Sequence, residues 1–426
     1  MKKIKMMMAA ALGVLVSCGS VKSGEEAIAA SRESKVVVAY VTSWSEVMPD
    51  PQYMTHINYA FGHVNESFNG VKIDNEERLR QIVDLRKQKP ELKVLLSIGG
   101  WGSGRFSEMA ANDEYRRAFA ADCDRVVKEF ALDGIDIDWE YPTSSMANIS
   151  SSPDDTENFT LLMQDIRAAI GNEKELTLAT VASARYIDFK AILPSVDFVN
   201  IMAYDMASAP KHHSALYPSG HSGDITSDGA VTAHLKAGVP PSKLVMGMPF
   251  YGRGGDGYPS FQDYNKVGNT DTQYTEKWDE VAQVPYLADK NDTLVFGFEN
   301  PRSLAIKCQY ILDKDLLGGM YWDYSGDNEQ GDLRRTVAEN LLGKPHKAKV
   351  LVLTERGGQH GGFTDAGLRW LAAEGAKGNF SITEINNARN ITEAYLSQFS
   401  LVIQLDFPPY TWPKEAEDAF VKYIEE

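Results

Sequence analysis

The 426-residue sequence predicts an α/β protein. We expect a (β/α)8 TIM barrel with a short insertion subdomain, followed by a truncated doubly wound, flavodoxin-like α/β segment. From Lys35 onward, eight β-branched runs alternate with segments of helical periodicity, the pattern of parallel βαβ units. After Lys347, three more strand–helix pairs follow. An open doubly wound sheet is the alternative for the first part, but no glycine-rich phosphate turn follows its first strand.

The barrel is expected over residues 35–343. Its strands are predicted at Val36–Val41, Ile57–Phe61, Lys93–Ile98, Gly134–Glu140, Leu176–Ala182, Asp197–Tyr204, Leu244–Tyr251 and Gly318–Tyr324. Helical spacing is clear at Glu76–Gln88, Asn112–Phe130, Asp155–Ile170 and Pro301–Asp313. The interval of about 252–300 is longer than the others and rich in Gly, Tyr, Asp and Asn. It predicts a small insertion at the barrel mouth that forms one wall of a cleft.

The last segment, 347–426, repeats the strand–helix pattern on a smaller scale. Its strands are predicted at Val350–Leu353, Ser381–Ile385 and Leu401–Leu405, and its helices at Thr364–Glu374, Ile391–Leu396 and Pro413–Ile424. Three parallel strands leave an unpaired edge, so we expect an incomplete domain.

Composition and charge narrow the function classes. Hydrophobic residues make up 43% and charged residues 24%, which is typical of a globular protein and argues against disorder. The chain has 59 acidic and 43 basic residues, a formal net charge of -16. Such a surface repels phosphate backbones, so no nucleic-acid binding is expected.

The N-terminus is typical of an export signal. Three lysines within Met1–Lys5 precede an apolar stretch, Met6–Val16. Leu15-Val16-Ser17-Cys18-Gly19 then resembles a bacterial lipobox. We therefore predict a lipoprotein signal over 1–18, lipidation of Cys18 and a tether over 19–34. The protein would be an exported bacterial lipoprotein, periplasmic or at the cell surface, held to the membrane by lipid alone. The alternative is a plain signal peptide in which Cys18 is incidental.

The remaining cysteines, Cys123 and Cys308, fall within helical patterns and are expected to be buried free thiols. No CxxC motif or His/Cys cluster occurs, so we expect no metal and no cofactor. His212 and His213 are expected to be exposed in a loop.

The fourth predicted strand carries three acids at alternate positions. Because side chains alternate along a strand, Asp136, Asp138 and Glu140 share one face, and two isoleucines and a tryptophan share the other. When several acids lie close together inside a barrel, repulsion between their charges raises the pKa of at least one of them. Glu140 lies at the carboxyl end of its strand, where barrel enzymes build their active sites. A protonated acid there can protonate a leaving group. An exposed acidic edge strand or a calcium loop fits worse, because EF-hand spacing is absent.

Asp133 to Glu140 matches the DxxDxDxE signature of glycoside hydrolase family 18, the chitinases and their relatives. Other motifs fall on the other predicted strands in the family's order. They are Ser97-Ile98-Gly99-Gly100 (SxGG), Met202-Ala203-Tyr204-Asp205 (MxYD), Tyr251-Gly252-Arg253 (YGR) and Gly318-Gly319-Met320-Tyr321-Trp322 with its tryptophan. The resemblance covers about Lys35 to Gly343.

The resemblance implies a retaining enzyme that cleaves β-1,4 bonds next to N-acetylglucosamine, with the substrate's acetamide oxygen as nucleophile. By position, Glu140 resembles the general acid that later acts as base. Asp138 resembles the residue that steadies the oxazolinium intermediate, and Asp136 would share a proton with it. Tyr204 resembles the hydroxyl donor that orients the acetamide, with Asp205 as a partner nearby.

Aromatic residues at the strand ends would be sugar platforms. Trp322 resembles the tryptophan under the sugar at the cleavage point, and Trp101 resembles one on the leaving-group side. Four further residues have two interpretations each, substrate contact or an internal contact. They are Tyr40 and Phe61 (cavity floor or packing), Met202 (facing inward or core) and Arg253 (sugar or a barrel acid).

The predicted function is therefore an endo-acting chitinase on chitin or chitooligosaccharides. Endo action is inferred from an insertion shorter than in deep-cleft chitinases. One alternative is an endo-β-N-acetylglucosaminidase acting on N-glycan cores. Another is a non-hydrolytic chitin- or glycan-binding surface protein, which the presence of Glu140 disfavours.

The C-terminal segment carries a weaker resemblance. Val350-Leu351-Val352-Leu353-Thr354 followed by His360 resembles the start of a trehalose-utilisation-protein-like (ThuA-like) domain, a class I glutamine-amidotransferase-like fold. No nucleophile elbow with Cys or Ser is visible, so no chemistry is assigned to it.

Overall fold

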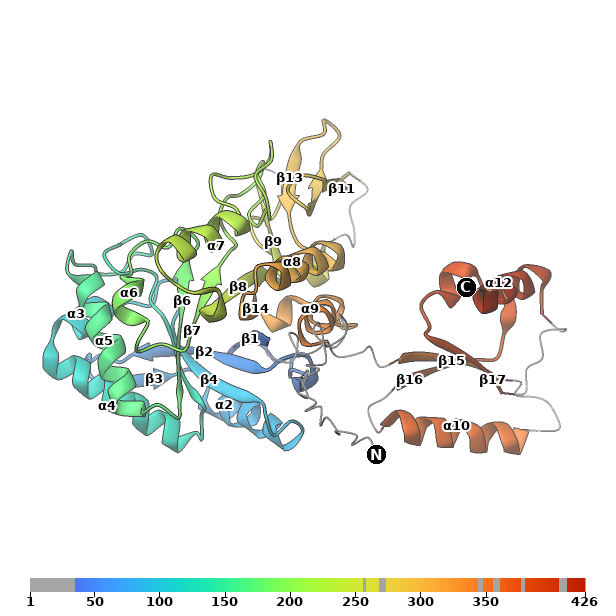
Figure 1. Ribbon diagram of the computed structural model, residues 1–426, viewed down its shortest axis with the longest axis horizontal. Helices are drawn as coiled ribbons and strands as arrows, with labels where there is room; N and C mark the ends of the chain where they lie inside the picture. Colours follow the sequence, from blue (N-terminus) through green and yellow to red (C-terminus); the bar gives the residue numbers. More distant parts are fainter. Residues whose placement is uncertain are drawn as a thin grey trace, which may run out of the picture.

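The computed structural model describes residues 35–255, 258–267, 273–343, 348–354, 361–376, 380–405 and 412–425. Within them, eight parallel strands close into a barrel with helices around it, which confirms the predicted fold class (Figure 1). The Cys18 lipidation site and the 19–34 tether lie outside the described residues.

The barrel strands run in chain order around the barrel, and β1 pairs with both β14 and β2 to close it. They are β1 (Val36–Thr42), β2 (His56–Val64), β4 (Lys93–Gly99), β5 (Gly134–Asp138), β6 (Glu175–Val181), β7 (Phe198–Met202), β8 (Leu244–Pro249) and β14 (Gly318–Trp322). A short β3 (Val71–Ile73) pairs antiparallel with the end of β2.

Several strands end earlier than predicted. The β5 strand stops at Asp138, so Glu140 lies two residues beyond its end, and β7 stops at Met202. Tyr251 belongs to a new strand rather than to β8. In each case the chain leaves the barrel ladder to enter the loops that form the mouth, and a hydrophobic pattern carries no mark of that departure.

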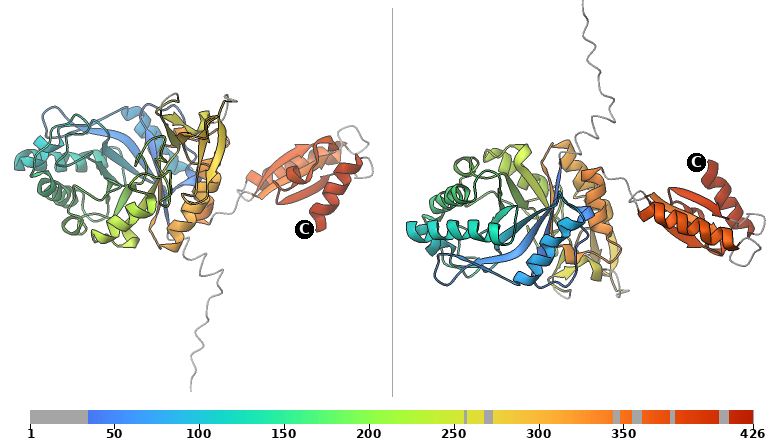
Figure 2. Two further views of the ribbon diagram at one scale, coloured as in Figure 1. Left: turned by 90° about the horizontal axis from the view of Figure 1, so that it is seen from above. Right: turned by 90° about the horizontal axis from the view of Figure 1, so that it is seen from below.

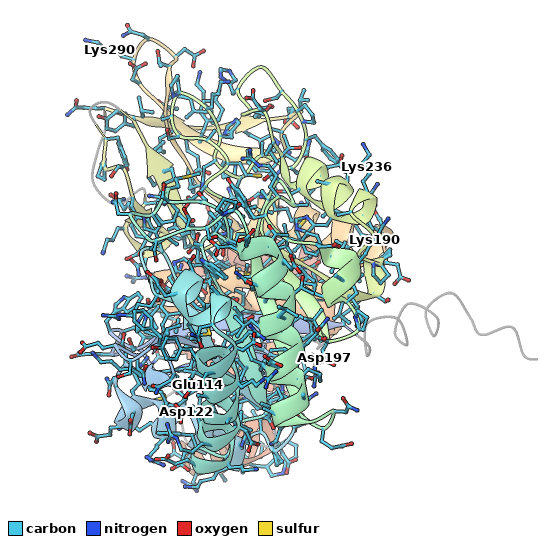
Figure 3. All side chains as sticks on the ribbon, turned by 90° about the vertical axis from the view of Figure 1, so that its left-hand side faces the viewer. Glu114, Asp122, Lys190, Asp197, Lys236 and Lys290 are labelled. Carbon is cyan, nitrogen blue, oxygen red and sulfur yellow. The ribbon has the colours of Figure 1, made fainter. Side chains whose placement is uncertain are left out.

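The helices cover the outside of the barrel. They are α2 (Glu76–Val83), α3 (Phe106–Ala111), α4 (Asp113–Glu129), α5 (Asp155–Ile170), α6 (Phe189–Ile192), α7 (Ser227–Lys236), α8 (Pro301–Asp313) and α9 (Asp332–Leu342). The first unit differs, because β1 is followed by a single 3-10 turn, Pro51–Tyr53. Charged side chains such as Glu114, Lys190 and Lys236 lie on the solvent side of these helices (Figure 3).

Amphipathic spacing explains the position of α5. Phe159, Leu162, Met163 and Ile166 are buried and follow the i, i+3, i+4, i+7 pattern of a helix that packs on a sheet. The helix ends at Ile170, and the residue that caps it is Gly171, whose φ of 75° favours glycine.

The hydrophobic core of the barrel has two layers. The larger layer lies between strands and helices and includes the free, buried Cys123 and Cys308, as predicted. The smaller layer fills the barrel lumen around Val38, Phe198 and Met320. The lumen layer supports the floor of the site described below.

The insertion between β8 and α8 is an antiparallel sheet in the order β10-β9-β13-β12-β11. Its strands are β9 (Tyr251–Gly254), β10 (Gln262–Asp263), β11 (Thr275–Asp279), β12 (Val284–Ala288) and β13 (Leu294–Gly297). The prediction that His212 and His213 are exposed is wrong, since they are 1% and 0% exposed. The insertion covers their loop, and His212 Nε2 lies 3.2 Å from Asp279 Oδ2.

The C-terminal segment forms a parallel three-stranded sheet in the order β16-β15-β17. Its elements are β15 (Ala348–Thr354), α10 (Gly361–Ala376), β16 (Phe380–Ile385), α11 (Glu393–Leu396), β17 (Leu401–Leu405) and α12 (Lys414–Glu425). The helices α10 and α12 cover opposite faces of this sheet (Figures 1 and 2). Leu371 of α10 packs with Val350 and Val352 of β15, and Ala416 and Ala419 of α12 pack with Leu351 and Leu353 on the other face.

Candidate active site

A cavity of about 670 Å³ opens at the carboxyl ends of the barrel strands. It brings together residues that are far apart in the sequence and that the motifs had singled out. They are Tyr40, Phe61, Trp101, Asp138, Glu140, Met202, Tyr204, Asp205, Arg253 and Trp322. Asp136 does not line the cavity but lies fully buried. This is the end of the barrel where enzymes of this fold position their chemistry.

Two glycines let the end of β4 approach its neighbours closely. Gly99 has φ +133°, and a Cβ there would lie 2.0 Å from the backbone oxygen of Asp138. Gly100 has φ +94°, and a Cβ there would lie 2.7 Å from the ring of Phe61. The N–H of Gly100 donates to the Asp138 oxygen at 2.9 Å. The SxGG motif therefore fixes the backbone beside the β5 acids.

Asp136 is held by hydroxyl and amide donors from four other strands. Tyr40 and Ser97 donate to its Oδ2 at 2.8 Å each, and Thr177 and Asn200 donate to its Oδ1 at 2.6 and 3.3 Å. Burial raises the pKa of Asp136, and these hydrogen bonds oppose the rise. Ser97, Thr177 and Asn200 were not predicted as site residues. Their inward positions on apolar strands were the signal that could have found them.

Asp138 and Glu140 have far fewer hydrogen-bond donors than Asp136 to offset the cost of burying a charge. Asp138 is 4% exposed, and its Oδ1 has no hydrogen-bond partner among the described residues. Burial, then the charges of Glu140 and Asp136, raise its pKa well above the usual value. Burial also raises the pKa of Glu140 to about 7, against a hydrogen bond from Tyr141 and with help from the Asp205 charge. At neutral pH, protons therefore remain on this pair of acids, facing the cavity.

Asp205 lines the same cavity, but its pKa is shifted in the opposite direction. Arg253 donates to it from Nε at 2.7 Å and from Nη2 at 2.5 Å, and His213 Nδ1 lies 3.5 Å from its Oδ1. Burial would raise the pKa of Asp205, but these partners outweigh it and hold the pKa well below the usual range. Of the two interpretations of Arg253, the pairing with a barrel acid is observed.

Tyr204 remains a neutral hydroxyl donor. Burial, followed by the charges of Asp138 and Glu140, raises its pKa well above the usual value. Its hydroxyl lies 3.8 Å from the Met320 sulfur, a weak partner, so its proton can be donated to a ligand in the cavity.

Neighbouring aromatic rings form the floor and rim. The ring centroid of Trp322 lies 5.6 Å from those of Tyr40 and Phe61 and 6.4 Å from that of Trp44. Both interpretations of Tyr40 and Phe61 apply, because these residues pack in the lumen core and also line the cavity. Trp101 is 62% exposed and stands at the rim with its ring edge-on to Tyr141.

Several lining residues were missed by the sequence reasoning. They are Trp44, Tyr141, Met146, Arg185, Tyr186, Met206, Tyr251 and Phe261. Tyr141 and Tyr251 directly adjoin or belong to quoted motifs, and that position was the available signal. Tyr186 and Phe261 lie in loops, where no periodicity marks a side chain as facing a cavity.

A sequence profile described as Glycosyl hydrolases family 18 matches residues 36–327. The chain belongs to this family. Among curated relatives, chitinase A1 of Niallia circulans is 29% identical over 413 residues, covering 72% of this chain and 58% of its own length. Chitotriosidase-1 of Mus musculus is 31% identical over 350 residues, covering 69% of this chain and 74% of its own.

A solved family 18 structure agrees with the fold. It is an N-acetylglucosaminidase from Paenibacillus barengoltzii, with a TM-score of 0.67 and 32% identity, covering 72% of this chain and 100% of its own. The residues that match family 18 include all the barrel strands and all the residues that line the cavity. The cavity described above therefore lies within the glycosidase domain.

Proposed function

We propose that the protein is a chitinase, a retaining and endo-acting glycoside hydrolase that cleaves β-1,4 bonds of N-acetylglucosamine polymers by substrate-assisted catalysis. The observation that carries the proposal is the Glu140 carboxyl, whose pKa of about 7 keeps a proton beside Asp138 in an aromatic-lined cavity. The family match and the chitinase relatives support the same activity.

In the first step, Glu140 donates its proton to the glycosidic oxygen as the bond breaks. The acetamide oxygen of the sugar attacks the anomeric carbon and forms an oxazolinium ion. Tyr204 donates a hydrogen bond that holds the acetamide in position, which makes the attack effectively intramolecular. In the second step, Glu140 takes a proton from water, and the water attacks the anomeric carbon and opens the oxazolinium ring. The configuration at the anomeric carbon is therefore retained.

Asp138 stabilises the positive intermediate because it acquires negative charge when its proton moves away. The charge of Asp136 favours a proton on Asp138 in the resting state. The four donors to Asp136 stabilise the charged form of that residue instead. Asp136 and Asp138 therefore form a pair in which one proton can be shared.

The aromatic residues give the substrate its position. Trp322 lies at the cavity floor and fits a platform under the sugar at the cleavage point. Trp44 and Trp101, 63% and 62% exposed, extend the apolar surface toward the rim. Apolar sugar faces stack on such rings while hydroxyl groups remain in water.

A second candidate is release of single N-acetylglucosamine units, because the solved relative from Paenibacillus barengoltzii is an N-acetylglucosaminidase. A product profile decides between them. With a chitin hexamer, endo action gives early products of intermediate length, whereas a monomer as the first product favours the second candidate. Cleavage of an N-glycan core but not of the hexamer would favour an endo-β-N-acetylglucosaminidase.

The variant Glu140→Gln tests the mechanism directly. We expect kcat to fall about 10²–10⁴-fold while the hexamer still binds, because the amide keeps the shape but cannot donate the proton. The matched control is Glu173→Gln, since Glu173 is exposed on the outside of the barrel. Wild-type protein that binds chitin oligomers without cleaving them would instead favour a glycan-binding protein.

We also propose a role for the N-terminal region, which lies outside the family match. Residues 1–18 are a lipoprotein signal, Cys18 is acylated, 19–34 is the tether, and the protein is exported and anchored by lipid. In the described part of the chain, no helix is long and apolar enough to cross a bilayer. Incorporation of labelled palmitate into the wild type but not into Cys18→Ala tests the anchor.

The C-terminal segment is proposed to be a partial ThuA-like domain. Its three parallel strands, with helices packed on both faces, support this assignment. The family match ends at residue 327, before this sheet begins.

A further inference from the structure

Ser103, His63 and Asp74 form a chain of hydrogen bonds that none of the catalytic steps above uses. Ser103 Oγ lies 2.8 Å from His63 Nδ1, and Asp74 Oδ2 lies 3.0 Å from His63 Nε2. His63 is 29% and Asp74 41% exposed at the side chain, so solvent and small molecules reach the group.

The backbone holds the three residues in place independently of their side chains. His63 lies near the end of β2, and Asp74 follows β3, which pairs antiparallel with β2. The N–H of Asp74 donates to the Phe61 oxygen at 3.0 Å, and the Tyr59 hydroxyl donates to the Asp74 backbone oxygen at 3.0 Å. Ser103 lies in the loop after β4, where its N–H donates to the Gly100 oxygen at 2.9 Å. The arrangement is therefore built into the barrel end.

The order of the three groups matches nucleophile, base and orienting acid. A carboxylate only accepts hydrogen bonds, so Asp74 fixes the proton on Nε2 of His63. The lone pair on Nδ1 is then free to take the hydroxyl proton of Ser103. Among the described residues, no acceptor receives the backbone N–H groups of Gly104 and Arg105, which follow the serine directly. The N–H after a nucleophile is a usual donor to a developing oxyanion.

A second Ser, His and Asp group in the same molecule lacks this order. Ser219 Oγ donates to Asp279 Oδ2 at 2.8 Å, and His212 Nε2 lies 3.2 Å from that same oxygen. The serine therefore points at the acid rather than at the imidazole, and His212 is 1% exposed. That group joins the insertion to the loop after β7, and it provides a matched control of equal composition.

We propose that Ser103, His63 and Asp74 form a second catalytic site, a serine esterase that removes short acyl groups from hydroxyls of a sugar chain. Ser103 Oγ attacks the ester carbonyl, and its proton passes to His63 Nδ1. The sugar alkoxide leaves with that proton, and the acyl group stays on Ser103. Water, deprotonated by His63, then hydrolyses the acyl-serine and releases the free acid and the serine.

The carrier of the ester is inferred from position. Trp101 lies two residues before Ser103 and lines the glycosidase cavity, and the ring centroids of His63 and Phe61 are 6.2 Å apart. A sugar chain in the cavity would thus pass beside the serine. This part rests on the proposed glycosidase function, whereas the ester cleavage itself does not.

The first experiment measures hydrolysis of p-nitrophenyl acetate and labelling by a fluorophosphonate, with the labelled peptide identified by mass spectrometry. We expect label on Ser103, and a loss on the order of 100-fold or more in ester hydrolysis in Ser103→Ala and His63→Gln. Ser219→Ala, the matched control, should retain both signals. Label elsewhere, no label, or unchanged hydrolysis in Ser103→Ala would overturn the proposal.

Two further variants separate this inference from the proposed glycosidase. Glu140→Gln should keep its esterase activity while losing cleavage of chitin oligomers. Ser103→Ala should keep oligomer cleavage, which also shows that it is folded. If wild-type protein shows no glycosidase activity but Ser103 still reacts, the proposed function fails and the esterase stands.

The second experiment tests the carrier. Acetate release is measured from O-acetylated chitooligosaccharides and from an O-acetylated oligosaccharide that lacks N-acetyl groups. Release from the first and not from the second supports a sugar chain held in the cavity. Equal rates on both, or reaction with p-nitrophenyl acetate alone, would overturn the assignment of the carrier.

Discussion

Glu140 and Asp205 line the same cavity and are both carboxylic acids, yet their pKa values are shifted in opposite directions from the usual value. Burial acts to raise the pKa of each. Glu140 has other acids as its charged neighbours, and its pKa rises to about 7. Asp205 accepts two hydrogen bonds from Arg253, and its pKa falls well below the usual range. The neighbours, rather than the residue type or the burial, decide which acid can donate a proton.

The largest effect, after that of Glu140→Gln, is expected from its neighbour. Asp138→Asn should lower kcat on chitin oligomers by about 10²–10³-fold, because the intermediate loses a negative charge placed beside it. KM should change much less. Steady-state kinetics of the variant beside the wild type measure both constants, and an unchanged kcat would contradict the role given to Asp138.

The pH profile tests the proton on Glu140. Above about pH 7, kcat/KM should fall about tenfold per pH unit, because the carboxyl loses the proton that it must donate. Circular dichroism at the highest pH used serves as the control for unfolding. A flat profile to pH 9 would show that Glu140 is not the acid or that its pKa is not raised.

The two acids should also differ in their effect on stability. The folded-state pKa of Glu140 is above its unfolded value, so stability falls as pH rises through that interval. Glu140→Gln should therefore raise the free energy of unfolding of the barrel at pH 8 by on the order of 1–3 kcal/mol, seen as a higher thermal midpoint, and have little effect near pH 4.

Asp205→Asn should act in the opposite direction. The lowered pKa of Asp205 means that its charged form stabilises the fold at neutral pH, and that this contribution is lost as pH falls. The pair is partly exposed, so the variant should lose no more than about 1 kcal/mol at pH 8. Thermal unfolding of both variants at pH 4 and pH 8 makes the test, and shifts of the same sign would contradict the comparison.

The sequence predicted the parts of this site that follow a repeating pattern. Alternation along β5 placed Asp136 and Asp138 inside the barrel, and the motif order placed Tyr204 and Trp322 at its end. Glu140 was found although its strand ends two residues earlier. Its position depends on the motif more than on strand geometry.

Other parts could not be predicted because they depend on contacts between distant segments. His212 and His213 lie in a polar loop that reads as exposed, but the inserted sheet buries them. Tyr186 and Phe261 reach the cavity from loops whose path no local pattern specifies. The pairing of Arg253 with Asp205 joins residues 48 positions apart, so only the folded chain could decide between the two interpretations of Arg253.

The smallest effect links the two acids directly. The negative charge of Asp205 is one of the causes that raise the pKa of Glu140. Asp205→Asn removes that charge, so the alkaline limb of kcat/KM should move to lower pH, by a fraction of a unit. A limb that stays in place would mean that Arg253 already neutralises Asp205 completely as seen from Glu140, and the acids on the two sides of the cavity would then titrate independently.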